Sequence, residues 1–152
     1  MKKVKLLSAI ADIPTTTNVI YPTNVLKKAV EDYNKNVFKT ISCIDSTGQD
    51  LNDCIGKVEE VKFEDGVVTV EISLFDTERG KAIQSMFDDG LSFSASLSGY
   101  VDFHEKNGNK IVKDIKNPDF KLSGTSWYGQ QTKIVDSFLD EDQKMVETFS
   151  EE

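Results

Sequence analysis

The chain has 152 residues, of which 38% are hydrophobic and 29% are charged, and its formal net charge is −8. These values are ordinary for a globular protein, and the length suits one domain with a sizeable core. No apolar run approaches the roughly 18 residues that a membrane-spanning helix needs, and the negative charge disfavours nonspecific binding to nucleic acid, so we expect neither a membrane nor a nucleic-acid partner.

The first third of the chain is predicted to hold a strand, a loop and a helix. The segment MKKVKLLSAIADI has too short an apolar run for a signal peptide, and we interpret Lys3–Ile10 as a first strand. The polar segment 12–18 contains a proline and indicates a loop. From about residue 24 to residue 34 apolar side chains recur on one helical face, and Thr23 or Asn24 can cap this helix. The apolar face consists of Val25, Leu26, Ala29, Val30 and Tyr33.

The middle of the chain has the pattern of a hairpin followed by a helix. Residues 38–44 alternate like a strand, and the next segment, to residue 53, is rich in turn residues. Two alternating runs, 56–63 and 67–75, flank the sequence Glu-Asp-Gly, which is a strong hairpin signal. A helix is predicted next, capped by Asp76 or Thr77 and ended by a glycine at position 90. It runs through Arg79, Ala82, Ile83, Met86 and Phe87.

The stretch from Phe87 to Phe103 contains the clearest strand pattern in the chain. Serines at positions 92, 94, 96 and 98 alternate with apolar residues, as in a strand with one buried face. The apolar positions are Phe93, Ala95, Leu97, Gly99, Val101 and Phe103. We therefore expect a row of hydroxyl groups, including that of Ser96, on the exposed face. Such a row is equally often no more than a solvated face.

The last third of the chain is predicted to be mainly extended. Asn107-Gly108-Asn109 is a hairpin turn that returns through 110–115, and Asn117-Pro118 is expected to break that strand. Residues 120–128 and 132–135 suit two further short strands.

The order of these elements favours an α+β fold, with a mainly antiparallel β-barrel or sheet flanked by helices. We place one domain at residues 1–135. Residues 136–152 carry seven acidic side chains against the single Lys144, and we predict an acidic C-terminal tail or a short helix there.

Cysteine and histidine are too few for the common metal sites. Cys43 and Cys54 have no metal-ligand spacing, and we expect two free thiols in a reducing compartment, with a bridge between them left open. The chain has one histidine, so a zinc site is not expected. We predict no metal and no cofactor.

Four segments, in order and spacing, resemble the prohead (capsid maturation) proteases of tailed phages. VIYPTNVLKKAVEDYN at 19–34 is similar to the Tyr-Pro-helix segment of that family, and residues 54–90 are similar to its Ile-Gly-x-Val strand, hairpin and Asp-Thr-x-x-Gly helix. SFSASLSGY at 92–100 resembles the strand that carries the nucleophilic serine, and DFKLSGTSW at 119–127 resembles the closing strand. The resemblance implies the fold of the herpesvirus assemblins, a β-barrel surrounded by helices. It also implies a role in head assembly, where the family cleaves scaffold and capsid proteins inside the immature shell.

The same resemblance places the nucleophile of the family at Ser96. A serine needs a base within hydrogen-bond reach to become nucleophilic, and in this family the base is a histidine ahead of the Ile-Gly-x-Val strand. Here that position holds Gln49-Asp50 in one alignment and Ser46 in another, and no histidine precedes residue 104. The residues after the nucleophile are also altered, to Leu-Ser-Gly.

Two other side chains are candidate bases for Ser96. His104 lies eight residues further along the same predicted strand, roughly 26 Å away if the strand is straight. Lys57 could form a serine–lysine dyad, but it lies close to Glu59 and Glu60 and is more typical of a solvated strand lysine. We expect neither to act on Ser96.

Loss of a triad histidine costs several orders of magnitude in rate. We therefore predict a phage head-assembly protein with a prohead protease fold that is catalytically degenerate and serves as a structural or scaffold component. Its expected partners are phage capsid and scaffold proteins and, as an open possibility, further copies of itself, in the prohead or virion in the host cytoplasm. Two alternatives stay open: an active serine protease with Ser96 as nucleophile, and a non-enzymatic β-rich virion binding module.

Overall fold

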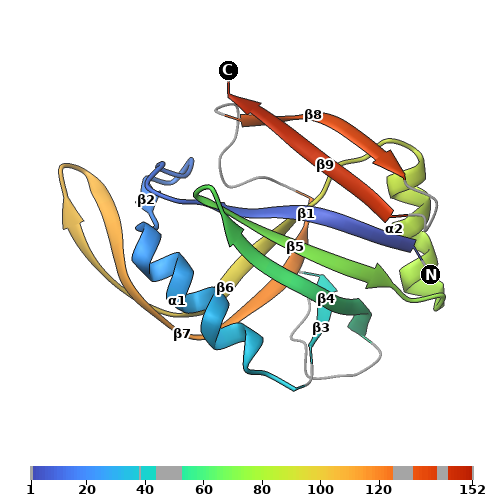
Figure 1. The fold of residues 1–152 in the computed structure, drawn as a ribbon, viewed down its shortest axis with the longest axis horizontal. Coiled ribbons are helices and arrows are strands. Elements are labelled where there is room, and N and C mark those ends of the chain that lie inside the picture. The colour runs from blue at the N-terminus through green and yellow to red at the C-terminus, as the bar shows by residue number, and fades with distance from the viewer. Residues whose placement is uncertain (1, 38, 44–52, 125–131, 140–143, 152) are drawn as a thin grey trace.

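The computed structural model describes residues 2–37, 39–43, 53–124, 132–139 and 144–151 (Figure 1). Within these ranges the chain forms one sheet and two helices, which confirms the predicted α+β class. The elements in chain order are β1 (Lys2–Ile10), β2 (Val19–Ile20), α1 (Thr23–Asn34), β3 (Thr40–Cys43), β4 (Cys54–Glu64), β5 (Val67–Leu74), α2 (Glu78–Asp88), β6 (Ser94–Lys106), β7 (Asn109–Ser123), β8 (Thr132–Leu139) and β9 (Lys144–Glu151).

The sheet is curled into a half-barrel (Figure 1). Its strand order is β2-β7-β3-β4-β5-β1-β9-β8, and β6 pairs with β7. The pairs β1–β5, β3–β4, β4–β5, β6–β7 and β8–β9 are antiparallel, whereas β1–β9, β2–β7 and β3–β7 are parallel. The expected mainly antiparallel sheet is therefore confirmed. Helix α1 packs against β7 and β4, and α2 packs against β4 and β5.

Helix α1 buries the face that its sequence pattern indicates. All five predicted apolar residues are buried, and the Tyr33 ring packs edge-on against Phe120 of β7 with the centroids 4.9 Å apart. The predicted cap is wrong, because Pro22 is the N-cap residue and no side chain caps the helix. The hydroxyl of Thr23 instead donates to the Asp12 carboxylate at 2.9 Å, which ties the helix to the preceding loop.

Helix α2 begins as predicted but buries a narrower face. Thr77 is the N-cap residue, and its hydroxyl accepts from the Gly80 backbone N–H at 3.1 Å. Ile83 and Phe87 are buried, whereas Ala82 and Met86 are exposed. Ile83 and Phe87 supply one buried apolar residue per turn, which is enough to cover the contact with β4 and β5.

The predicted hairpins have the backbone that their turn residues favour. Asp65 and Gly66 join β4 to β5 with φ values of 52° and 79°, and Asn107 and Gly108 join β6 to β7 with 53° and 81°. Two central residues with positive φ match the right-handed twist of the flanking strands. Alternate residues of β5, from Val68 to Leu74, lie in the core as expected.

Strand β6 departs from the predicted alternation in both halves. Ser94 and Ser96 are buried together with Ala95 and Leu97, so the first half is covered on both faces and the serines are not on an exposed face. From Gly99 onward the strand is exposed, including the two apolar residues Val101 and Phe103 that were predicted to be buried. The reason is tertiary, because only the first half of β6 lies within the curled sheet (Figure 1).

Strand β7 runs through the predicted break. Ser98 pairs with Asp119 and Tyr100 pairs with Lys116, so Gly99 alone faces two residues, Asn117 and Pro118. This irregularity accommodates the proline, which has no N–H to donate, and Asn117 takes up the kink with a φ of 53°. The long β7 therefore replaces the two separate strands that the sequence suggested.

The acidic C-terminal segment contributes strands β8 and β9, where a tail or a short helix was expected. The two strands pair with each other, and β9 pairs with β1. Their β-branched residues favour extended backbone over helix. The division into a domain at 1–135 and a tail stays a prediction. No helix in the described ranges is long and apolar enough to cross a membrane.

Candidate functional site

Ser96, the predicted nucleophile position, lies in a polar row that crosses three strands. Ser96 of β6 is paired with Lys121 of β7, and Lys121 is paired with Ser42 of β3. Side chains of directly paired residues point to the same face of a sheet, and neighbouring strands lie about 4.8 Å apart. Ser96, Lys121 and Ser42 are therefore consecutive neighbours, and we call them the polar row.

The apolar residues on the opposite face set this register. Ala95 is paired with Leu122, and Leu97 is paired with Phe120, and all four are buried in the main core. A slip of one residue would turn this apolar set away from the core, so the register of β6 on β7 is strongly specified. The alternation that buries these residues also places the polar row on the other face.

Ser96 is in an unusual environment for a nucleophile. Its side chain is 3% exposed, and its hydroxyl has no hydrogen-bond partner among the described residues. A buried hydroxyl that makes no hydrogen bond costs about 1–3 kcal/mol of stability. The neighbouring Ser98, in contrast, is half-buried, and its hydroxyl donates to the Asp119 carbonyl at 3.4 Å. Ser96 is thus covered, and its hydroxyl makes no hydrogen bond with a described residue.

The predicted base positions Gln49 and Asp50, and Ser46 with them, lie outside the described residues, and their roles stay predictions. The chain enters this segment from Cys43, which is the residue after Ser42 of the polar row and is paired with Leu122.

The structure keeps the two alternative bases away from Ser96. His104 is exposed and is paired with Ile111 toward the outer end of the β6–β7 hairpin. Lys57 is exposed in β4, and β7 and β3 separate β4 from β6, so the two strands are about 14 Å apart. Lys121 has no signal in the local sequence, because its place opposite Ser96 depends on a strand pairing between residues 25 positions apart.

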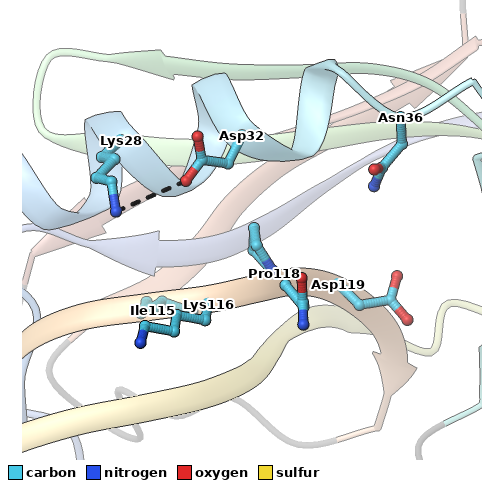
Figure 2. Close-up of a pocket in the computed structure, with 8 residues that line it drawn as sticks. Lys28, Asp32, Asn36, Ile115, Lys116, Pro118 and Asp119 are labelled. Atoms are coloured by element: carbon cyan, nitrogen blue, oxygen red, sulfur yellow. Dashed lines mark ion pairs between the residues drawn. The ribbon is translucent and has the colours of Figure 1, made fainter.

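A second feature, not predicted from the sequence, is a groove between α1 and β7 (Figure 2). It has a volume of about 520 Å³ and is open to solvent. One wall is a stripe of α1 and its C-terminal end, and the other is a continuous stretch of β7. The lining residues are Lys28, Asp32, Asn36, Ile115, Lys116, Asn117, Pro118 and Asp119.

An ion pair links α1 to β7 beside this groove. The Lys28 ammonium donates to the Asp114 carboxylate of β7 at 2.8 Å and lies 3.9 Å from Asp32, one helical turn away. The hydrogen bond with Asp114 raises the pKa of Lys28 and lowers the pKa of Asp114. The Lys28 and Asp114 charges are thereby compensated by each other.

The β7 edge that faces α1 is closed to strand addition. Beyond the residues that pair with β2 and β3, Pro118 has no N–H, Asn117 kinks the backbone, and the Asp114 carboxylate accepts a hydrogen bond from the N–H of Ile115.

The titratable groups around the groove do not form a catalytic pair. Burial and then the negative charge of Asp119 raise the pKa of the Tyr33 phenol of α1. Nothing in this groove combines a nucleophile with a base, so it is a less suitable catalytic site than the polar row.

Metal and thiol chemistry find no support in the described ranges. No group of three or more histidine, cysteine or acidic side chains is placed to hold a metal ion there. Cys43 and Cys54 are free thiols, as predicted, and the Cys54 thiol donates to the Thr40 hydroxyl at 3.4 Å.

The fold is similar to that of a solved phage protein, the bacteriophage T4 capsid assembly protease gp21. The TM-score is 0.63 with 15% sequence identity, and the alignment covers 80% of this chain and 78% of that chain. At this identity the likeness shows the fold alone, and it supports the protease-like fold expected from the sequence. A scan against protein-family models and a search of curated proteins gave no match.

Proposed function

We propose that this protein takes part in phage head assembly as a catalytically degenerate member of the capsid-protease fold, with a structural or scaffold role. The observation that carries this proposal is the state of Ser96 in that fold. The serine is present on a strand paired with β7, but it is covered and its hydroxyl makes no hydrogen bond with a described residue that could serve as a base. Its partners in this role are phage capsid and scaffold proteins within the prohead.

The chemistry of peptide cleavage explains why this state matters. The serine oxygen must reach the substrate carbonyl, and a base must take its proton as the bond forms. An oxygen on a side chain that is 3% exposed cannot be approached without a local rearrangement. The one histidine in the chain, His104, lies on the exposed half of the same strand and cannot serve as that base. The apolar residues of both strands around Ser96 are nevertheless buried in the main core, as expected if the fold itself serves assembly.

The proposal is tested by treating the purified protein with a fluorophosphonate probe and measuring its intact mass. The wild-type chain, Ser96→Ala and the matched control Ser98→Ala are compared, each also co-expressed with the capsid and scaffold proteins of the same phage. We expect no adduct, no processed partner and the same yield of assembled heads from all three. An adduct or a cleavage product that disappears only in Ser96→Ala would contradict the degenerate state.

One observation favours a second candidate, an active serine protease. Lys121 lies directly opposite Ser96, and serine–lysine pairs can replace the histidine when the lysine is neutral. In that case the Lys121 amine would take the Ser96 proton and later return it to the leaving amine. Lys121→Met would then abolish probe labelling, whereas Lys116→Met, an exposed lysine on the same strand, would not. Equal labelling of the two variants would exclude Lys121 as the base.

A further inference from the structure

The outer half of β6 is an open edge of the sheet. In the described ranges β6 pairs with β7 and with no other strand, and near the hairpin end β7 lies between β6 and β2. Figure 1 shows this end of the hairpin projecting beyond the rest of the sheet, with β6 on the outside. We call residues 100–106 of β6 the outer edge segment. Its backbone is free on one side to pair with a further strand.

Large side chains are exposed along this segment. Tyr100 is 74% exposed, Val101 41% and Phe103 44%, although Val101 and Phe103 are paired with the buried residues Ile115 and Val112. Monomeric proteins usually protect an open edge with a proline, a bulge, a short strand or charged side chains, and this segment carries Asp102, Glu105 and Lys106. The outer edge segment contains no proline, and the irregularity between Asp102 and Phe103 leaves the extra residue on β7. The segment is therefore continuous, and the register of a pairing decides whether its charges oppose or favour that pairing.

We propose that the outer edge segment pairs, antiparallel and in register about Phe103, with the same segment of a second copy of this chain. Directly opposite residues of an antiparallel pair point to the same face of the sheet. A two-fold axis perpendicular to the sheet must therefore pass between the two copies of one residue, which then lie opposite each other. With the axis at Phe103, the two phenyl rings face each other. Asp102 then lies opposite His104 of the second copy, and Tyr100 lies opposite Lys106 of the second copy.

The neighbouring registers are less favourable. An axis at Asp102 would place two carboxylates directly opposite each other, which is destabilising in a strand pair. An axis at His104 would place Phe103 opposite Glu105 and would leave Tyr100 beyond the end of the partner strand. The register at Phe103 instead combines an aromatic pair with an acid–histidine pair and an ammonium near a tyrosine ring. This self-complementarity is the reason for assigning a second copy rather than a capsid segment as the occupant.

The interface is small and separate from the polar row. Seven residues on each side, extended only slightly by neighbouring side chains, form a weak and concentration-dependent dimer rather than an obligate one. The pairing adds a strand to each hairpin and joins two sheets edge to edge, which gives an assembly protein a two-fold contact. It requires no catalytic activity, so it can be tested independently of the proposed function.

Sedimentation equilibrium over a wide range of protein concentrations tests the dimer, and a charge exchange tests its register. His104→Glu places a carboxylate opposite Asp102 twice per dimer and is expected to weaken association about tenfold. Asp102→Lys combined with His104→Glu restores opposite charges and is expected to restore association. Lys113→Glu, which changes an exposed charge on β7 away from this edge, is the matched control. All of these positions are exposed or lie on the open edge, and circular dichroism checks that each variant folds.

A cross-linking experiment tests the two-fold axis directly. Phe103→Cys places two thiols opposite each other, so a short thiol cross-linker is expected to give a covalent dimer. Val101→Cys faces Glu105 of the second copy and is expected to give little, and the wild-type chain reports on the native thiols. A chain that stays monomeric at every concentration, or a dimer that His104→Glu leaves unchanged, would overturn the proposal. Pairing of this segment with a capsid protein but not with itself would equally overturn it.

Discussion

The buried hydroxyl of Ser96 leads to a stability prediction that separates a degenerate site from a working one. Replacement by alanine removes a polar group that has no partner among the described residues, at a position that is 3% exposed. Leaving such a group unpaired costs about 1–3 kcal/mol. The void left by one oxygen offsets part of this gain, since deletion of a whole buried methylene costs about 0.5–1.5 kcal/mol. We expect Ser96→Ala to be more stable than the wild type by about 1 kcal/mol.

Equilibrium unfolding in urea measures this difference. With a slope of about 1–3 kcal/mol per molar urea, a gain of 1 kcal/mol raises the midpoint by roughly 0.5 M. Ser98→Ala is the control, because its hydroxyl is half-buried and donates to the Asp119 carbonyl, so its removal is expected to cost up to about 1 kcal/mol. If Ser96→Ala lowers the midpoint as much as Ser98→Ala does, the Ser96 hydroxyl has a stabilising partner and the reasoning is refuted.

Three further predictions concern the packing of α1 and the β6–β7 hairpin. The Tyr33 hydroxyl is also buried without a partner among the described residues, so Tyr33→Phe is expected to gain about 1 kcal/mol in the same urea assay. Because burial raises the pKa of Tyr33, the wild type loses stability as pH rises above about 10, where the unfolded phenol ionises, and this variant should lack that part of the loss. Gly99→Ala would place a Cβ 2.7 Å from the Lys116 carbonyl oxygen at a φ of +153°. A thermal melt should show that this variant is destabilised by about 1–3 kcal/mol or more. The loss should be smaller for Gly108→Ala, because a Cβ at Gly108 would meet no atom within 4 Å. The hydrogen bond from Lys28 lowers the pKa of Asp114, so the stability from this pair is present above the ordinary aspartate pKa range and is lost as pH falls through the lowered pKa. When stability is measured against falling pH, Asp114→Asn should lose less stability than the wild type. An equal loss of stability would contradict the pairing.

Local patterns in the sequence were sufficient to predict most of the secondary structure. The apolar face of α1, the Thr77 cap of α2 and the two hairpin turns depend on residues that lie within a few positions of one another, and all are confirmed. Such features follow from backbone preference and from the period of a helix or strand, which one segment carries by itself. The order of segments was likewise sufficient to indicate the α+β class, whereas the protease-like fold was implied by the resemblance of four segments to the prohead proteases.

The candidate site could be predicted only in part. Ser96 was placed correctly on a strand, but the same alternation predicted an exposed hydroxyl where the structure has a buried one. The alternation of a strand reports that two faces differ, and it does not reveal that further structure covers the polar face as well. The base positions Gln49 and Asp50 stay predictions from the resemblance alone.

The remaining features were decided by contacts between distant segments. The pairing of β7 with β6 on one side and with β3 on the other places Lys121 between Ser96 and Ser42, and neither neighbour is close to it in the sequence. The curl of the sheet, in turn, buries the first half of β6 and leaves residues 100–106 as an open edge. Periodicity identifies which residues prefer burial, but the closure of the sheet determines how many of them obtain it, because burial depends on which strands become neighbours.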